Sequence, residues 1–349
     1  MRIVVAGTGK YLPEFVASND WVIATMAQHG LTHTPGRGQP ITSEMIESLV
    51  GIRERRYSAD TENTSDHALK AANQALARAG ISWQDLSVIR LGSSSPEKFF
   101  PSTACLTLFK ASGPGVEAVD DLAACTSGLV AMIDVQRALL IEPNYQYGLA
   151  IGAEVLATRM VDFSDLNANL WGDGAGAVVL AKAPHEEDRG IICSILGSIP
   201  DAAPLTESVG MGTRISDLGA KPNIRLRGHD IQRVVLDLIP DLIPRTIAKA
   251  NEVLAQKQAF SRPPLEIGDV DIFAVHQANA RIFDLPAKKL GIPKNKFFVN
   301  VDRYGNMSSA SVMVCLTEII EQGLVGPGSL VMLISFGGGI TYGSLLVRL

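Results

Sequence analysis

Amphipathic helical stretches and short runs rich in β-branched residues alternate along the chain, and this alternation most constrains the fold. Residues 65–80 (SDHALKAANQALARAG) carry apolar side chains at helical spacing and end on a glycine, which is typical of a helix C-terminus. Residues 85–91 (DLSVIRL) then have the composition of a buried strand. Such an alternation favours helices packed on sheets over an all-α or an all-β fold.

The same order of elements recurs in the second half of the chain. A helix is predicted over about 231–255, a proline-rich break follows, and residues 269–275 (DVDIFAV) have the composition of a strand. When the two sets of elements are aligned, Gly92 falls opposite His276. The repeated order predicts two halves of like topology.

A second pair of matching stretches surrounds Cys125 and Asn306. Both stretches, VEAVDDLAACTSG and FFVNVDRYGNMSSAS, have the pattern of a strand, a tight turn and a helix. If the halves pair about a pseudo-twofold axis, these two residues occupy equivalent turns that meet at the centre. We place the halves at residues 1–185 and 186–349. The alternative is chance, because short α/β stretches look alike in sequence.

The composition narrows the class of protein. Apolar residues make up 46% of the chain and charged residues 19%, which suits a large buried interior. A net charge of -5 provides no basic surface for nucleic acid or an anionic membrane. No uncharged apolar stretch reaches the roughly 18 residues of a membrane span, and the N-terminus is typical of a first strand rather than a signal peptide. We expect a soluble, cytoplasmic protein.

The spacing of cysteines and histidines argues against a metal site. The four cysteines include no CxxC pair and the six histidines no HExxH motif, so we expect a reduced setting, no metal and no cofactor. Residues 171–180 (WGDGAGAVVL) superficially resemble a nucleotide-binding loop. They lead from a turn into a strand, however, which is the reverse of the required order. We predict a structural turn near the floor of the functional site instead.

Cys125 is the candidate nucleophile. It precedes a predicted helix over 129–140, and unpaired N–H groups and the helix dipole lower the pKa of a thiol at a helix N-terminus. Small neighbouring residues leave room for a substrate such as a thioester. The alternative is a cysteine that packs as a small hydrophobe, which we accept for the others, Cys105, Cys193 and Cys315.

Three further features are candidate partners of this thiol. His276 follows a predicted buried strand, at the strand end where α/β proteins place their sites. Asn306 lies in a turn that would also accept an asparagine merely as a cap. The glycines 337–339 follow another buried strand and let the backbone aim N–H donors at a ligand, as an oxyanion hole requires. The alternatives are that His276 is only structural and that the glycines form a sharp turn at a sheet edge.

Eight stretches of the chain, taken together, closely resemble the β-ketoacyl-acyl carrier protein synthase III family of the thiolase superfamily. They span nearly the whole chain in the family's order: GTGKYLP (7–13), VGIRERRY (50–57), FPSTAC (100–105), AACTSG (123–128), GDGAGAVVL (172–180), HQAN (276–279), YGNMSSAS (304–311) and FGGGITYGSLLVR (336–348). The resemblance implies a thiolase-like αβαβα layered fold, built from two pseudo-symmetric halves, and a homodimer.

The resemblance also implies a reaction. Cys125 would carry an acyl group whose oxyanion is held by the N–H groups of Cys125 and Gly338. His276 and Asn306 would bind the thioester oxygen of a malonyl extender, which loses carbon dioxide and attacks the acyl group. The Cys-His-Asn set matches neither chain-elongating synthases, which use Cys-His-His, nor biosynthetic thiolases, which use Cys-His-Cys. Plant-type polyketide synthases share Cys-His-Asn but have a different glycine loop, so the type III synthase branch remains. Initiation of fatty acid synthesis is therefore the leading role.

Substrate recognition departs from the family pattern. The family stacks the CoA adenine between a Trp and an Arg, and Met45 and Leu166 stand at those positions here, which removes stacking and cation–π attraction. The extra polar stretch 28–39 is either a surface loop or a change to the tunnel mouth. The resemblance further implies a gate at the end of the acyl pocket, Phe100, and a pocket that includes Phe336, Gly228, Met45 and Leu166.

Acyl carrier protein is the expected partner. Arg281, Lys288 and Lys289 match basic positions with which the family binds the acidic carrier, although a solvated helix face would carry the same residues. The departures keep a second role open: a specialised-metabolism relative that condenses or transfers unusual acyl groups, of polyketide-starter, alkylquinolone or dialkylresorcinol type, from a non-CoA or β-ketoacyl substrate. A carrier-binding pseudo-enzyme is a third reading, which the intact Cys-His-Asn set argues against.

Overall fold

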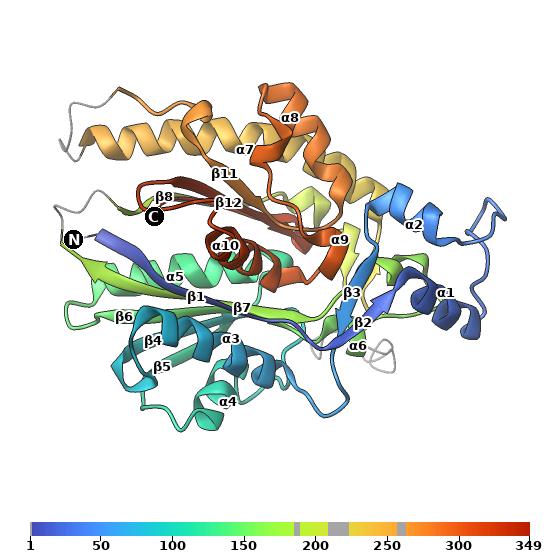
Figure 1. Cartoon of the computed structure of the whole chain (residues 1–349), viewed down its shortest axis with the longest axis horizontal. Coiled ribbons are helices and arrows are strands. Elements are labelled where there is room, and N and C mark those ends of the chain that lie inside the picture. The colour runs from blue at the N-terminus through green and yellow to red at the C-terminus, as the bar shows by residue number, and fades with distance from the viewer. Residues whose placement is uncertain (1, 185–188, 209–222, 257–262) are drawn as a thin grey trace.

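Two mixed sheets form the framework of the protein in a computed structural model (Figure 1). The structure describes residues 2–184, 189–208, 223–256 and 263–349. The lower sheet in Figure 1 has the order β1-β7-β6-β4-β5 and the upper sheet the order β11-β12-β13-β8. Their strands are β1 (Arg2–Tyr11), β4 (Leu86–Gly92), β5 (Glu117–Asp121), β6 (Tyr147–Glu154), β7 (Gly174–Ala183), β8 (Gly190–Ser198), β11 (Ile272–Val275), β12 (Leu330–Gly337) and β13 (Thr341–Arg348).

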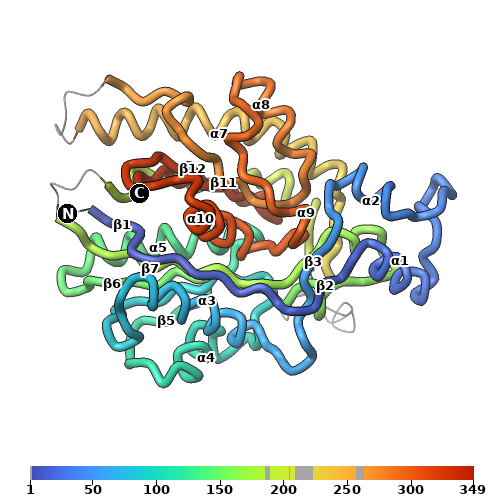
Figure 2. Tube along the Cα trace, viewed as in Figure 1, coloured from blue at the N-terminus to red at the C-terminus, as the bar shows by residue number. Residues whose placement is uncertain are grey.

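Helices cover both outer faces of the sheets and also fill the space between them. Some lie under the lower sheet, others above the upper sheet, and others run between the sheets (Figure 2). In that order they are α3 (Thr64–Ala79) and α4 (Thr103–Lys110), α7 (Gly228–Gln256) and α8 (Asp284–Leu290), and α5 (Ser127–Ile141) and α10 (Ser311–Glu321). The predicted αβαβα layering is confirmed.

Shorter elements gather at one end of the molecule, on the right of Figure 1. Between α1 (Asn19–Gln28) and α2 (Ser43–Val50) the extra polar stretch 28–39 is mostly exposed and closes on itself, because the N–H of Thr34 donates to the carbonyl of Gln39 at 2.8 Å. The stretch is thus a surface loop. These elements are β2 (Phe15–Ser18), α1 (Asn19–Gln28), α2 (Ser43–Val50), β3 (Glu54–Tyr57), α6 (Leu156–Arg159) and α9 (Val301–Tyr304), and a small ribbon pairs β9 (Thr206–Glu207) with β10 (Arg225–Leu226).

The two sheets repeat one topology. β4 and β6 are parallel, as are β11 and β12, and each pair is continued by two antiparallel strands, β7 with β1 and β13 with β8. The place of β5 is taken in the upper sheet by Phe297, which forms a parallel bridge with Phe273. The prediction of two pseudo-symmetric halves is confirmed. Their proposed boundary, between residues 185 and 186, lies outside the described residues and stays a prediction.

The strand predicted over 269–275 is shorter than expected. Residues Ile267–Asp269 form a 3-10 turn, and β11 begins only at Ile272. The carboxylate of Asp269 accepts the N–H of Glu266 at 2.7 Å, which closes the turn. Asp85 closes the same turn before β4, by accepting the N–H of Ser82 at 2.8 Å. Both aspartates therefore end a turn rather than begin a strand.

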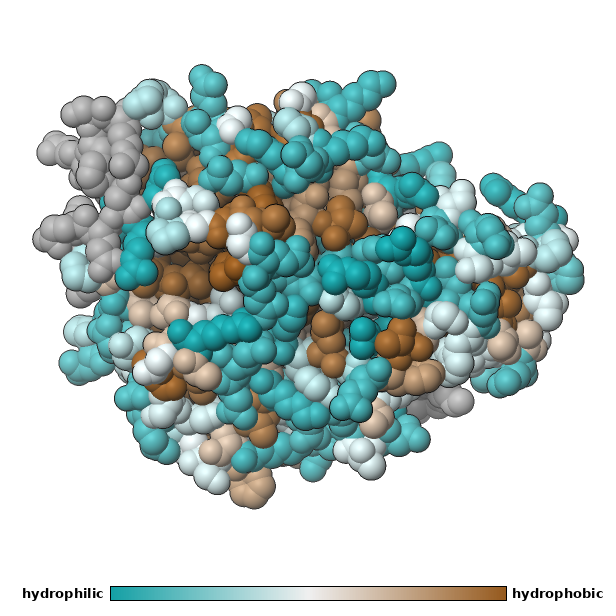
Figure 3. Space-filling model, viewed as in Figure 1, coloured by the Kyte–Doolittle hydropathy of each residue, from teal (hydrophilic) through white to brown (hydrophobic). Residues whose placement is uncertain are grey.

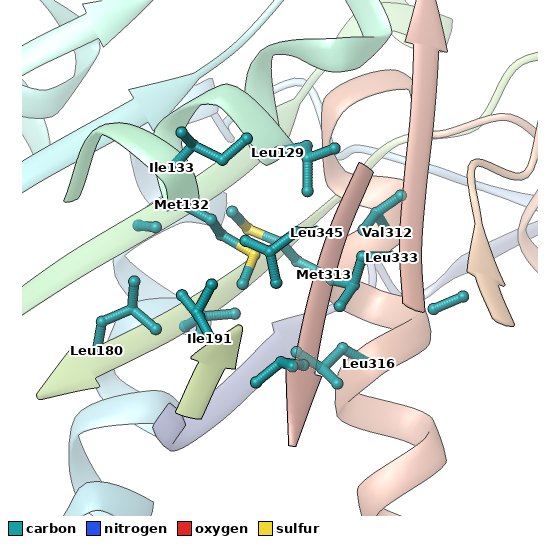
Figure 4. Close-up of a cluster of buried hydrophobic side chains, with 14 of the residues drawn as sticks. Leu129, Met132, Ile133, Leu180, Ile191, Val312, Met313, Leu316, Leu333 and Leu345 are labelled. Atoms are coloured by element: carbon teal, nitrogen blue, oxygen red, sulfur yellow. The ribbon is translucent and has the colours of Figure 1, made fainter. Parts of the chain in front are cut away.

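The main hydrophobic core lies between the sheets and explains the apolar sequence of α5. Residues 124–141 are long and apolar enough to cross a membrane on length and composition alone, yet half of this window is buried. The window also includes Asp134 and Arg137, which pair at 2.8 Å. Apolar side chains on the face drawn in Figure 3 lie in separate patches among hydrophilic ones. Figure 4 shows the core where α5 and α10 meet both sheets, at Leu129, Met132, Ile133, Leu180, Ile191, Val312, Met313, Leu316, Leu333 and Leu345.

Candidate active site

Cys125, His276 and Asn306 line one cavity of about 100 Å³ where the two halves meet. Cys125 lies in the 3-10 turn η2 (Ala124–Thr126), which leads into α5. His276 directly follows β11, and Asn306 stands between α9 and the 3-10 turn η9 (Ser308–Ala310), which leads into α10. The structure thus brings together the three residues that the sequence predicts as partners.

The turn at Cys125 is held tightly by its surroundings. The hydroxyl of Ser127 accepts the N–H of Ala123 at 2.7 Å and donates to the carbonyl of Ala124 at 2.7 Å, which supports the positive φ of 49° at Ala124. From the other half, the hydroxyl of Ser335 donates to the carbonyl of Cys125 at 2.9 Å.

Glycine is required where β12 passes this turn. A Cβ added to Gly337 would stand 2.6 Å from the backbone N of Cys125, closer than real Cβ atoms come. Only a residue without a side chain therefore lets β12 come this close to the N–H of Cys125. Gly338 follows directly and also lines the cavity. Two backbone N–H groups beside a reactive sulfur fit the requirements of an oxyanion hole.

The predicted lowering of the thiol pKa is wrong. Burial raises the pKa of Cys125 to about 12; a hydrogen bond with Ser308 lowers it and the carboxylate of Glu154 raises it. The helix start does provide backbone N–H groups that stabilise a thiolate. The thiolate loses more hydration free energy among apolar side chains, however, than these groups offset. The thiol is therefore protonated in the ligand-free protein.

His276 is a buried, neutral imidazole. Its side chain is 1% exposed, and its ring packs edge-on against Phe336 with centroids 5.1 Å apart. Burial lowers the pKa of His276 to about 3. Among the described residues Nδ1 has no hydrogen-bond partner. An uncharged imidazole has one N–H donor and one acceptor, so it can donate or accept a hydrogen bond within the cavity.

The amide of Asn306 is oriented by its own turn. The side-chain oxygen accepts the N–H of Ser308 at 2.9 Å, which leaves the NH₂ group as the donor toward the cavity. The backbone N–H of Asn306 donates to Leu170 at 2.7 Å, and its carbonyl accepts the N–H of Gly172 at 3.0 Å. The glycine-rich turn at 171–180 is thus a structural support beneath the site, as the sequence predicts.

A second cavity, of about 350 Å³, begins on the other side of Cys125. Its apolar lining includes Leu156, Met160 and Ile224, and a polar pair, Ser94 and Ser308, lies beside the thiol with the two hydroxyl oxygens 3.0 Å apart. Apart from Ser308, which belongs to the motif 304–311, no sequence pattern pointed to these residues, because they come from separate segments that only the fold joins.

The predicted pocket residues fall into two groups. Phe336 and Gly228 line the first cavity. Met45 and Leu166 instead pack into a hydrophobic cluster under α1 and α2 and do not appear among the residues that line either cavity. Phe100 is 86% exposed, so within its own chain it closes neither cavity.

The predicted docking residues lie near the far end of α2 and on α8. The guanidinium of Arg281 donates to the carbonyls of Glu47 (3.0 Å) and Ser48 (2.7 Å), where α2 ends. Lys289 pairs with Asp237 at 3.1 Å, and Lys288 is exposed beside it. Arg281 therefore has a structural role in fastening α2, whatever else it contacts.

The fold and the site together define a condensing enzyme of the thiolase fold. Two family models match the chain: 3-oxoacyl-[acyl-carrier-protein] synthase III over residues 120–200, and the C-terminal part of the same enzyme over residues 260–349. The β-ketoacyl-[acyl-carrier-protein] synthase III of Xanthomonas campestris pv. campestris is 37% identical over 99% of this chain and 97% of its own length. That of Clostridium beijerinckii is 34% identical over 99% of both chains.

Solved structures agree with these relatives. The crystal structure of 3-oxoacyl-[acyl-carrier-protein] synthase III from Aquifex aeolicus matches with a TM-score of 0.85 and 31% identity, over 99% of this chain and all of the other. The chain belongs to the β-ketoacyl-[acyl-carrier-protein] synthase III family. It is an acyltransferase that performs a condensation.

Proposed function

We propose that Cys125 carries the acyl group and that His276 and Asn306 act on the malonyl extender. The observation that supports this assignment is the single cavity onto which all three side chains open. The protonated state of the thiol adds a requirement: its proton must leave as the donor thioester binds. The imidazole of His276 lines the same cavity and can accept a hydrogen bond from the thiol, but burial keeps it neutral, so the proton passes to the leaving donor thiol.

The first half-reaction transfers the acyl group. The sulfur of Cys125 attacks the donor thioester carbonyl, the N–H groups of Cys125 and Gly338 stabilise the oxyanion, and the donor thiol leaves with the proton. The acyl chain then lies in the second cavity, beyond Ser94 and Ser308. The apolar lining of this cavity suits an alkyl chain.

The second half-reaction forms the carbon–carbon bond. The NH₂ group of Asn306 and the N–H of His276 donate to the thioester oxygen of the malonyl group, where negative charge develops as carbon dioxide leaves. The resulting carbanion attacks the acyl carbonyl and expels the sulfur of Cys125. No metal or other cofactor takes part in this scheme.

Intact-mass spectrometry tests the assignment. Incubation with acyl donors should add one acyl group to the protein, and Cys125→Ala should abolish the adduct. Asn306→Ala should still form the adduct and then release carbon dioxide from malonyl-carrier protein roughly 10²–10³-fold more slowly, as expected for one lost oxyanion donor. An adduct that persists in Cys125→Ala would overturn the assignment.

The proposal includes an acyl carrier protein as partner and a cytoplasmic homodimer. Large apolar side chains are exposed along the edge that β5 forms in the lower sheet, and these are Phe99, Phe100, Phe109, Val119 and Leu122. A second copy of the chain would bury them and bring Phe100 toward the partner's acyl cavity. Size-exclusion chromatography with light scattering tests this: the wild type should be a dimer and Phe100→Asp largely a monomer.

The packing of Met45 and Leu166 favours a second candidate, in which the donor is an acyl-carrier protein in specialised metabolism rather than acyl-CoA. Neither residue offers an aromatic face or a cation to adenine, and both are taken up by the cluster under α1 and α2. Donors of increasing chain length, each as CoA and as carrier thioester, separate the two candidates. A strong preference for short acyl-CoA would exclude the second candidate.

A further inference from the structure

Glu154 is a carboxylate buried between the two halves, and no step of the proposed reaction uses it. It is the last residue of β6 and is 0% exposed. Both oxygens accept backbone N–H groups, from Ser94 (2.9 Å), Ser95 (3.0 Å) and Ser309 (3.2 Å). The hydroxyls of Ser95 (2.6 Å) and Ser309 (2.7 Å) donate to it as well. A buried group with this many partners fixes the segments that supply them.

These contacts tie the segment after β4 to the turn η9. Between Glu154 and the second cavity stand Ser94 and Ser308, whose hydroxyl oxygens are 3.0 Å apart. The hydroxyl of Ser308 lies close enough to lower the pKa of the Cys125 thiol, and the backbone N–H of Ser308 donates to the side-chain oxygen of Asn306 at 2.9 Å. Glu154 therefore holds Ser309, which directly follows Ser308, and Ser308 orients the Asn306 amide.

We propose that Glu154 is a positioning residue for the malonyl step, because it fixes the turn that directs the Asn306 NH₂ group into the cavity. It touches no reacting atom and acts through Ser309. The inference rests on the proposed function, since it requires Asn306 to act on the extender. Nothing in the reaction scheme needs a carboxylate at this position, so the assignment goes beyond that scheme.

The two half-reactions should respond unequally to the loss of this carboxylate. Cys125 keeps independent support from Ser127 on its own side and from Ser335 on the other half. The backbone of Asn306 is held by Leu170 and Gly172, but its side-chain amide is oriented by the N–H of Ser308, which is one residue from the Glu154 contact. A displacement of about 1 Å in a catalytic group costs roughly 100-fold in rate. We therefore expect the malonyl step to fall far more than acylation.

The decisive variant is Glu154→Gln. It keeps the shape of the side chain, but its NH₂ group must face backbone N–H donors that cannot reverse their direction. Enzyme that is already acylated is mixed with malonyl-carrier protein, and carbon dioxide release is followed over one turnover. We expect release to fall at least tenfold while acylation changes less than about threefold.

The matched control is Asp120→Asn. Asp120 precedes Cys125 by five residues, and its carboxylate accepts two backbone N–H groups of α4. This variant should leave the ratio of the two rates unchanged.

Crystal structures of both variants supply a readout that does not depend on activity. The bond between Asn306 and Ser308 should be broken or displaced in Glu154→Gln and kept in Asp120→Asn. Equal losses in both half-reactions, or an unmoved Asn306 turn, would overturn the inference while leaving the proposed function standing. Absence of both half-reactions in the wild type would instead refute the proposed function. If Glu154→Gln fails to fold, Ser309→Ala removes one donor and should lower the same ratio by a smaller factor.

Discussion

The turn around Cys125 and the turn around Ser309 occupy equivalent places in the two halves. Their backbones match, with φ of 49° at Ala124 and 43° at Ser308, and each leads into a helix between the sheets. The chain runs 33 residues from Gly92 to Cys125 and 33 from His276 to Ser309. Sequence comparison paired Cys125 with Asn306. The structure corrects this, because Ser309 is the equivalent residue and Asn306 lies three positions earlier in the same turn.

The difference between the turns is the residue that faces each of them. β6 and β12 both have eight residues, and they end on Glu154 and Gly337. Glu154 closes its turn by accepting the N–H of Ser309, whereas Gly337 places no side chain beside the N–H of Cys125. The turn of Ser309 is thus closed by a side chain. The turn of Cys125 is open in the sense that Gly337 places no side chain over its N–H, although Ser127 and Ser335 hold its backbone. A duplicated fold can divide stability and chemistry between its copies in this way.

The largest effect should come from closing the open turn with Gly337→Ala. The new Cβ would stand 2.6 Å from the backbone N of Cys125 and displace it or block the oxyanion position. We expect the acylation rate to fall by roughly 10²–10³-fold, the cost of one lost oxyanion donor. Time-resolved intact-mass measurement gives the rate. Gly326→Ala, where an added Cβ meets nothing within 4 Å, is the control. Wild-type acylation in Gly337→Ala would contradict the comparison.

A thiol in the closed turn should stay unreactive. Ser309→Cys, made in a Cys125→Ala background, puts sulfur at the equivalent position, but Glu154 already occupies the space beside its N–H. We expect no acyl adduct at position 309 with any donor, as read by peptide mapping. Alkylation after denaturation shows that the thiol is present. An adduct there in the folded protein would mean that the two turns differ less than their contacts indicate.

The comparison also predicts a pH effect on stability, because His276 stands where the other half has Gly92. The pKa of His276 is lowered to about 3 in the folded protein, against roughly 6.5 when unfolded. As the pH falls below about 6.5, the unfolded state gains a proton that the folded state cannot hold, so folding stability is lost. Thermal unfolding at pH 7.5 and pH 5.0 should show a steeper loss in the wild type than in His276→Asn. Parallel pH profiles would contradict a neutral, buried imidazole.

The smallest effect should come from Ser335→Ala, which makes β12 resemble β6 at the equivalent residue, Gly152. It removes the hydrogen bond from Ser335 to the carbonyl of Cys125. We expect the free energy of unfolding to fall by about 0.5–1.5 kcal/mol in urea denaturation. Ser164→Ala, which removes an exposed hydroxyl, should change it by much less. A loss above about 3 kcal/mol would show that the turn depends on this one bond.

Much of the fold and the three central residues could be predicted because their signals are local. Helical periodicity, turn residues and ordered motifs lie within short windows, so they predicted the layers and the Cys-His-Asn set. The pKa of Cys125 could not be predicted in this way, since burial by segments over 100 residues away outweighs the helix start. Glu154 was missed because an acidic residue after the strand GLAIGA is typical of a surface turn. Its burial depends on Ser309, 155 residues later.

Cys125 borders both cavities, and under the proposed function this arrangement sets the order in which the two substrates bind. An acyl chain on the sulfur can remain in the second cavity while the arm of the donor leaves the first cavity and the arm of the extender enters it. Two carrier arms that enter through the same cavity must use it in turn, which gives a ping-pong order of substrates. Double-reciprocal plots of rate against donor concentration, at several extender concentrations, should give parallel lines, which are the kinetic signature of a ping-pong mechanism.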